Sequence, residues 1–372
     1  MAHSLFSVTP QKVKLVNTKN RIIKTKIPLP NTDKKIKILS NIESRSMHGQ
    51  LPIIWDRAEG YKVYDSAGNC WIDFTSTIFV TNTGHSNKRI FNAIKSNLNK
   101  QLISSYSYVN ETRIKYLQKL LKFAGSNFEK AFLMSAGTEA TEAALKLMRM
   151  HGERNKKKRG IIGIKGNWHG RTLGAQMLGY NKQQKEWIGY SDKNIHHIDF
   201  PLPWKFNEEE SITLLYDSIK KLKKNGIDIN TDICGFMLET FQGWGAIFYP
   251  KKYVQEIYKI CKKFNILLTF DEMQSGFGRT GKKFGYQHYG VDPDLICIGK
   301  AMGGGVPVSG VLGKSKIMDL PEVGNMSSTH SANPLVCAAG IAVIEEIEKK
   351  NLVNESQRKG KILIKELNKI KK

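Results

Sequence analysis

Five short, unbroken runs of apolar residues, set among longer segments with helical periodicity, constrain the fold of this chain most. The runs cover residues 131–134, 161–164, 233–238, 266–270 and 295–298. Apolar runs without alternating polar residues are typical of strands that helices cover on both faces. A succession of such strands and helices predicts an α/β fold with a mainly parallel sheet and crossover helices.

The segments around this core carry their own signals. Amphipathic patterns predict helices over residues 90–100, 111–123 and 138–150, a helix opened by Asn333 and Pro334, and a last helix over residues 354–371. Residues 60–65 and 70–74 alternate like strands around the turn sequence 66–69, which predicts a β-hairpin. The first fifty residues are basic and interrupted by Pro28 and Pro30, which predicts an arm leading into the fold.

The charge balance is unusual, since 58 Lys and Arg residues against 33 Asp and Glu residues give a net charge of +25. A nucleic-acid partner would account for such a charge. However, nearly all of these residues are Lys, whereas phosphate and base recognition favour Arg. The Lys residues are also scattered, in runs such as 156–158 and 220–224. We therefore interpret the charge as a solvated surface and expect neither a nucleic-acid nor a membrane partner.

The five cysteines are odd in number, widely spaced and set in apolar segments: Cys70, Cys234, Cys261, Cys297 and Cys337. This pattern fits neither a disulfide framework nor a zinc site with paired ligands, so we expect no metal and a reducing compartment. No apolar stretch approaches the ~20 residues that span a bilayer. Residues 1–8 have no basic segment ahead of their apolar patch, so we expect no secretion signal and a cytoplasmic protein.

Polar residues that directly follow the apolar runs are the candidates for chemistry, because ligands bind beyond the carboxyl ends of parallel strands. Residues 135–138 form a small-residue turn that opens a helix, where free backbone amides favour a phosphate. Asp271 follows one run, and Lys300, preceded by Gly299 and followed by the glycine-rich segment 301–305, follows another. The alternatives are an ordinary helix cap by Ser135 or Thr138, a cap or ion pair by Asp271, and an inert surface lysine.

A lysine, an aspartate and a phosphate turn at one sheet edge fit pyridoxal 5'-phosphate. This cofactor needs an amine for a Schiff base, a carboxylate that keeps its pyridine nitrogen protonated, and an anchor for its phosphate. The lysine must also be desolvated, because a free ammonium group is not nucleophilic. The sequence supplies each of these parts.

Longer motifs around these residues closely resemble the class III aminotransferases of fold type I. The matching segments run from about Leu51 to the C-terminus and comprise residues 84–85, 135–149, 168–172, 238–243, 269–281, 293–300 and 328–334. The resemblance implies a large domain with a seven-stranded, mainly parallel sheet and a small α+β domain built from both chain ends. The implied boundaries are residues 1–75 for the N-terminal arm and small-domain portion, 76–325 for the cofactor domain and 326–372 for the start of the C-terminal small domain.

The resemblance also assigns roles to individual residues. Lys300 corresponds to the Schiff-base lysine that moves a proton between the substrate and the cofactor, and Asp271 to the partner of the pyridine nitrogen. The other implied cofactor-binding residues are Ser135, Ala136, Gly137 and Thr138 at the phosphate, Trp168 stacked on the ring where the family usually has Tyr or Phe, His169, Gln274 near the phenolic oxygen, the site-shaping Glu239, and Thr329, which reaches the phosphate of the neighbouring subunit. The role of Thr329 implies a homodimer with shared active sites.

The substrate side of the resemblance is less complete. Arg171 matches an arginine that contacts a substrate carboxylate in some branches, a role that suits a planar guanidinium fork, with a structural ion pair as the alternative. Many family members that use glutamate as a substrate have, at the position of Trp244, a glutamate side chain that swings against an arginine. Because this chain has a tryptophan there, this conformational switch is not expected in it. Family members also continue past a helix like residues 354–371, so we expect this chain to contain only the start of the C-terminal small domain.

We therefore predict a homodimeric enzyme that moves an amino group from an amino acid or amine to a 2-oxo acid. A 1,2-aminomutase, a decarboxylating transaminase or a racemase would use the same Lys300 and Asp271, because the pocket walls select the bond that breaks. A catalytically impaired dimer that binds the cofactor without turnover is another alternative, and a nucleic-acid binder is a third, motivated by the charge alone.

Overall fold

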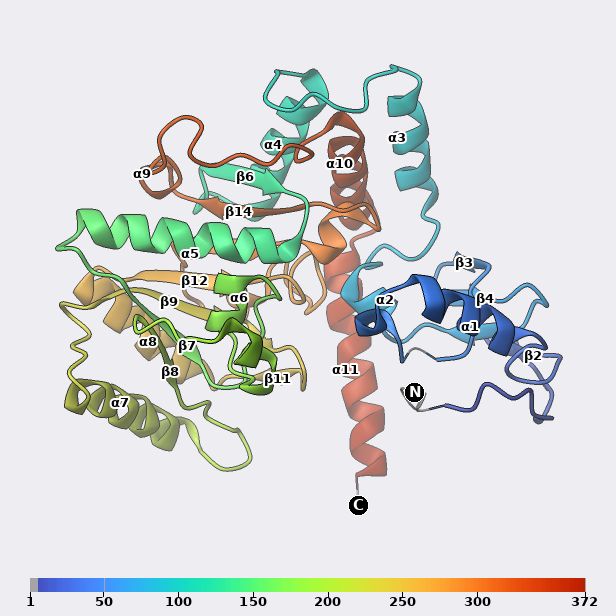
Figure 1. Cartoon of the computed structure of the whole chain (residues 1–372), viewed down its shortest axis with the longest axis horizontal. Coiled ribbons are helices and arrows are strands. Elements are labelled where there is room, and N and C mark those ends of the chain that lie inside the picture. Colours follow the sequence, from blue (N-terminus) through green and yellow to red (C-terminus); the bar gives the residue numbers. More distant parts are fainter. Residues whose placement is uncertain (1–5, 50, 372) are drawn as a thin grey trace. The chain divides into compact units, whose positions relative to one another are not determined.

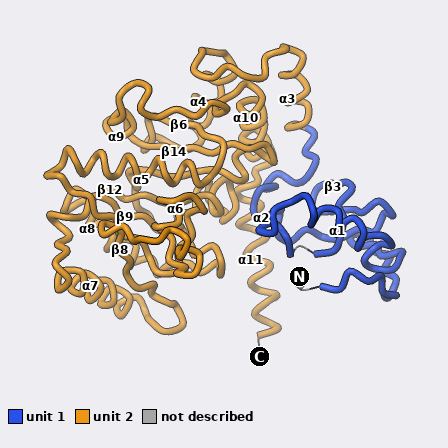
Figure 2. The backbone as a smooth tube through the Cα atoms, in the orientation of Figure 1, with its two compact units in different colours: residues 1–88 blue, residues 89–372 orange. Residues whose placement is uncertain are grey.

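The computed structural model describes residues 6–49 and 51–371, and it divides the chain into two compact units, Met1–Lys88 and Arg89–Lys372 (Figure 2). The N-terminal patch that we considered for a secretion signal therefore lies partly outside the described residues. No helix in the described ranges is both long and apolar enough to cross a membrane. The three-part domain division implied by the resemblance stays a prediction.

The first unit is built on a five-stranded antiparallel sheet in the order β1-β2-β5-β4-β3. The bounds are β1 Val16–Asn17, β2 Ile22–Ile23, β3 Arg57–Glu59, β4 Lys62–Tyr64 and β5 Cys70–Ile72, with helices α1 Thr32–Ile42 and α2 Ser76–Phe79 and the short 3-10 helix η1 Arg45–Met47. The predicted hairpin is confirmed as β4 and β5, and Asp65 closes its turn by accepting hydrogen bonds from the backbone nitrogens of Ala67 and Asn69. The residues before Leu51, predicted as an arm, contribute β1, β2 and α1.

The second unit contains a seven-stranded sheet in the order β6-β14-β13-β12-β9-β7-β8 (Figure 1). The bounds are β6 Lys130–Met134, β7 Gly160–Ile164, β8 Ile195–Ile198, β9 Ile233–Glu239, β12 Leu267–Asp271, β13 Leu295–Ile298 and β14 Ser309–Gly313, with a separate pair β10 Phe241–Gln242 and β11 Ile247–Phe248. Strand β14 runs antiparallel to both neighbours, β6 and β13, whereas β12, β13, β9, β7 and β8 pair in parallel. The predicted α/β fold with a mainly parallel sheet is confirmed, and the five apolar runs are five of its strands.

Helices cover both faces of this sheet, with α5 on one side and α7 and α8 on the other (Figure 1). The bounds are α3 Lys88–Leu98, α4 Glu111–Ala124, α5 Gly137–Arg154, α6 Leu173–Leu178, α7 Glu208–Lys224, α8 Lys251–Phe264, α9 Ser315–Met318, α10 Pro334–Lys349 and α11 Leu352–Ile370, with 3-10 helices η2 Gln183–Ile188, η3 Gly285–His288 and η4 Lys300–Gly303. Helix α5 lies close to the sheet because its buried face includes small residues such as Ala140 and Ala144. At Gly235 of β9 a Cβ atom would lie 2.4 Å from the sulfur of Met148, so a larger residue there would force the side chain of Met148 to move. The position of α5 matters because its first turn forms part of the candidate site.

Candidate active site

Two buried carboxylates meet at the carboxyl ends of neighbouring strands. Asp271 ends β12 and pairs in register with Glu239 at the end of β9, so both side chains lie on the same face of the sheet. Asp271 is 5% exposed and Glu239 is 4% exposed. Burial raises the pKa of Glu239 to about 8, and the negative charge of Asp271 acts in the same direction.

A cavity beside these carboxylates brings together residues from five separate segments of the chain. Its lining includes eight residues predicted from sequence: Gly137, Thr138, Trp168, His169, Glu239, Asp271, Gln274 and Lys300. Four further lining residues were not predicted: Gly170, Phe241, Met273 and Ser275. Each of these four lies within the motifs that carried the prediction, so adjacency in the sequence was the signal that could have found them.

Lys300 presents a free amine to this cavity. It follows β13 after Gly299 and begins η4 in a left-handed conformation, with a φ of 42°, which is uncommon for a residue with a side chain. Within the described residues its Nζ atom has no hydrogen bond or ion pair. Backbone strain of this kind is typical of functional sites, where the surrounding structure holds a residue in place.

The turn before α5 is arranged to leave two backbone amides for an anion. The side chain of Glu139 accepts hydrogen bonds at 2.9 Å from the backbone nitrogens of both Ser135 and Ala136. Gly137 and Thr138 are the first residues of α5, where backbone N–H groups have no partner within the helix. Neither Ser135 nor Thr138 caps the helix, and Ser135 and Ala136 do not line the cavity.

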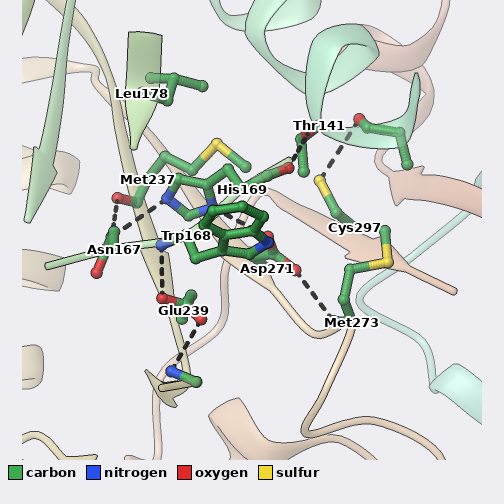
Figure 3. Close-up of polar contacts among 12 residues, drawn as sticks. Thr141, Asn167, Trp168, His169, Leu178, Met237, Glu239, Asp271, Met273 and Cys297 are labelled. Atoms are coloured by element: carbon green, nitrogen blue, oxygen red, sulfur yellow. Dashed lines mark hydrogen bonds and ion pairs between the residues drawn. The ribbon is translucent and has the colours of Figure 1, made fainter. Parts of the chain in front are cut away.

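The loop after β7 carries Trp168 and His169 to the two carboxylates (Figure 3). The backbone nitrogen of Trp168 donates to Oε2 of Glu239 at 2.9 Å, and Nδ1 of His169 lies 2.9 Å from Oδ2 of Asp271. Gly170 completes this approach, because a Cβ atom there would lie 2.3 Å from Oγ1 of Thr138. The loop is thus tied to α5, β9 and β12 at once.

Residues that follow β12 complete the surroundings of Asp271. The backbone nitrogen of Met273 donates to Oδ1 of Asp271 at 3.0 Å, so each carboxylate oxygen of Asp271 accepts one hydrogen bond. In Gln274, which also lines the cavity, Oε1 is buried and has no hydrogen-bond partner among the described residues. A buried polar atom without a partner is costly in free energy, which points to a ligand group at this position.

Besides Ser135 and Ala136, three residues singled out from the sequence lie outside the cavity lining. Arg171 is exposed, and its guanidinium carbon lies 4.6 Å from the ring centroid of Trp168. This stacking holds Arg171 at the edge of the site, and it has no ion pair among the described residues. Thr329 is exposed in a turn before α10, and Trp244 is 69% exposed after β10. The described single chain therefore does not bring Thr329 to the cavity.

The residues of this cavity fit pyridoxal 5'-phosphate. The unpartnered amine of Lys300 suits an aldehyde, and the carboxylate of Asp271 suits a protonated ring nitrogen. The two amides at the start of α5 suit a phosphate, and the half-buried indole of Trp168 offers a ring face. No group of three His, Cys, Asp or Glu residues in the described part of the chain could hold a metal ion.

Comparisons with known proteins agree with this geometry. Residues 44–372 match the family model described as aminotransferase class-III. An acetylornithine aminotransferase of Clostridium acetobutylicum is 36% identical over 82% of this chain and 74% of its own length, and ornithine aminotransferase 1 of Staphylococcus saprophyticus is 33% identical over 88% and 79%. The crystal structure of an acetylornithine aminotransferase from Elizabethkingia anophelis matches 92% of this chain and 79% of its own with a TM-score of 0.75 and 27% identity.

Proposed function

This chain belongs to the class III aminotransferases, a family that uses pyridoxal 5'-phosphate, and we propose that it transfers an amino group from an amino acid to a 2-oxo acid through Lys300. One observation carries the role of Lys300: its amine has no hydrogen bond or ion pair among the described residues, and Lys300 lines the same cavity as Asp271 and Gly137. In a chain with 58 basic residues, this placement separates Lys300 from the solvated lysines of the surface.

The cofactor, when bound, supplies an aldehyde carbon and a ring that accepts electrons from the substrate. Lys300 would hold the aldehyde carbon and would move the proton at the substrate carbon that carries the amino group. Asp271 would keep a proton on the ring nitrogen. The backbone amides of Gly137 and Thr138 would hold the phosphate, and Trp168 would lie against the ring.

For the amino donor we propose an ornithine-type substrate. The support is that curated relatives at 33–36% identity are named acetylornithine aminotransferase and ornithine aminotransferase. Arg171, at the edge of the site beside Trp168, is the proposed contact for the substrate carboxylate. Assays with ornithine, N-acetylornithine and 2-oxoglutarate would test this, and loss of donor binding in Arg171→Lys with unchanged cofactor binding would support the role of Arg171.

We also propose a cytoplasmic homodimer in which Thr329 serves the partner's site. The exposed position of Thr329, away from the cavity of its own chain, is compatible with this role, and the five free, buried cysteines are compatible with a reducing compartment. Mixing Lys300→Ala chains with Thr329→Val chains tests the sharing. A mixed dimer would contain one site with both native residues, so activity should return on mixing. No recovery after verified subunit exchange would contradict the shared site.

The test of the function is the near-visible absorption spectrum of the protein with added pyridoxal 5'-phosphate. We expect an absorption band that borohydride traps as a covalent adduct at Lys300, and we expect Lys300→Ala to lack it. Amino donors that are substrates should change the band and yield the corresponding oxo product. A band without any turnover would favour a cofactor-binding protein without catalysis, and rearranged amino acid without an acceptor would favour a mutase.

A further inference from the structure

Buried side chains connect Asp271 through His169 to Asn167 (Figure 3), and Tyr249 follows Asn167. Nδ1 of His169 lies 2.9 Å from Oδ2 of Asp271, and Nε2 of His169 lies 3.2 Å from the amide nitrogen of Asn167. The hydroxyl of Tyr249 donates to Oδ1 of Asn167 at 3.2 Å. Asn167 and Tyr249 do not line the cavity and have no part in the proposed chemistry.

The surroundings of Asn167 determine which way its amide group points. Its nitrogen lies 3.5 Å from the backbone carbonyl oxygen of Met237, which can only accept a hydrogen bond. Its oxygen receives the hydroxyl proton of Tyr249. Turning the amide over would place two carbonyl oxygens against each other in a buried site. The amide nitrogen of Asn167 therefore faces His169 as a donor.

This orientation determines the protonation of His169. Because Asn167 donates to Nε2, that nitrogen must carry a lone pair, and the single ring proton is on Nδ1, where it is donated to Asp271. A second proton on Nε2 would point at the N–H group of Asn167. All four side chains are buried, with His169 and Asn167 each 3% exposed, so water cannot relieve such a conflict.

We propose that Asn167, oriented by Met237 and Tyr249, is a positioning residue that keeps His169 neutral, so that Asp271 retains its negative charge for the cofactor's ring nitrogen. A positively charged His169 would neutralise Asp271 from behind and weaken its hold on a protonated ring. The protonation of His169 is a property of the protein alone. The consequence for the ring nitrogen rests on the proposed function.

The first experiment uses the cofactor-free full chain with ¹⁵N-labelled histidine and reads the protonation of each ring by NMR at neutral pH. His169, assigned with the variant His169→Gln, should show a protonated Nδ1 and an unprotonated Nε2. His197 is the internal reference, because its Nε2 lies 2.8 Å from the carbonyl oxygen of Leu178 and should carry the proton instead. A wild-type His169 that is protonated on both nitrogens, or on Nε2 alone, would overturn the proposal.

The second experiment replaces the donor by a carboxylate in Asn167→Asp, which should protonate both ring nitrogens of His169. The dissociation constant of pyridoxal 5'-phosphate, titrated by absorbance, should then rise about tenfold or more. This magnitude is the one seen in metal sites when a residue that hydrogen-bonds to a metal ligand is lost. Tyr249→Phe, which leaves Oδ1 of Asn167 without its donor, should give a smaller rise and serves if Asn167→Asp does not fold. Asn225→Asp, exposed after α7, makes the same charge change and should alter neither readout.

The outcomes separate this proposal from the proposed function. If the wild type binds no pyridoxal 5'-phosphate, the proposed function fails while the NMR result on His169 still stands. If the wild type binds it and Asn167→Asp protonates His169 without weakening that binding, the positioning role of Asn167 is wrong and the proposed function is unaffected.

Discussion

Oε2 of Glu239 lies 2.9 Å from the backbone nitrogen of Trp168, so an acidic side chain at the end of β9 holds the loop that follows β7. The other oxygen of Glu239 accepts from the backbone nitrogen of Gly243 at 3.0 Å. One buried carboxylate thus joins two loops that border the cavity. Its neighbour in the sheet register is Asp271, and this closeness of two acids has a consequence for pH.

Glu239 should make the stability of the protein fall as the pH rises. Its pKa is raised from 4.5 to about 8, so between these values the folded chain holds a proton that the unfolded chain has lost. The group's contribution to the free energy of unfolding therefore decreases with pH, by up to about 1.4 kcal/mol per pH unit. In urea denaturation of the cofactor-free protein, the free energy of unfolding of Glu239→Gln should rise relative to that of the wild type from about pH 5 to about pH 8. A stability difference between Glu239→Gln and the wild type that stays constant over this pH range would contradict the raised pKa.

Asp271→Asn should remove most of the activity. The side chain keeps its size but loses its charge and one of two acceptor oxygens, which serve His169 and Met273. Since electrostatic partners of this kind contribute on the order of 10²- to 10³-fold to turnover, we expect kcat to fall by that order. Steady-state kinetics with saturating cofactor would measure it, and a change below about tenfold would remove Asp271 from its proposed role.

Gly170→Ala should destabilise the loop that carries Trp168 and His169. The new Cβ atom would lie 2.3 Å from Oγ1 of Thr138, whereas at Gly305, which also has a positive φ, nothing lies within 4 Å of a Cβ atom. Gly305→Ala is therefore the control for backbone strain alone. In urea denaturation, we expect Gly170→Ala to lower the free energy of unfolding by about 1–3 kcal/mol more than the control does. Equal losses would mean that the contact with Thr138 relaxes freely.

Glu272 is a buried carboxylate with four hydrogen-bond donors. Its replacement should lower the free energy of unfolding more than the replacement of any single donor. It accepts hydrogen bonds from the hydroxyls of Thr240 and Ser275 and from the backbone nitrogens of Gly285 and Tyr286, which join the ends of β9 and β12 to η3. Glu272→Gln has one acceptor oxygen for these four donors, so we expect a loss of about 3 kcal/mol or more. Thr240→Val removes one donor and should cost about 1 kcal/mol. Similar losses for both variants would contradict this account.

The cysteines should react with thiol reagents only after unfolding. All five are free and buried, and burial raises the pKa of Cys234 and of Cys337 to about 12. Thiolates, which are the reactive form, are therefore scarce in the folded protein. Titration with a chromogenic disulfide should detect five thiols in denaturant and almost none in the native protein. Rapid reaction of native protein would indicate an exposed cysteine.

Local patterns in the sequence were sufficient for the α/β fold and for the placement of Asp271 and Lys300. Unbroken apolar runs identify buried strands, and a polar residue at the end of such a run lies at the ligand edge of the sheet. Strands β8 and β14 were not predicted, because histidines interrupt the first and the second has only two consecutive apolar residues, Val311 and Leu312. Their place in the sheet depends on pairing with neighbours, which leaves no periodic signal of its own.

The contacts within the site depended on the folded chain. The hydrogen bond between His169 and Asp271 joins residues 102 positions apart, and that between Trp168 and Glu239 joins residues 71 apart. The side chain of Glu139 accepts hydrogen bonds from the backbone amides of Ser135 and Ala136, which we had predicted to bind a phosphate. Residue type and spacing report the local conformation of a segment, whereas the partner of a buried polar group is set by which segments pack together. For that reason the identities of the principal residues could be predicted, and their hydrogen-bond partners could not.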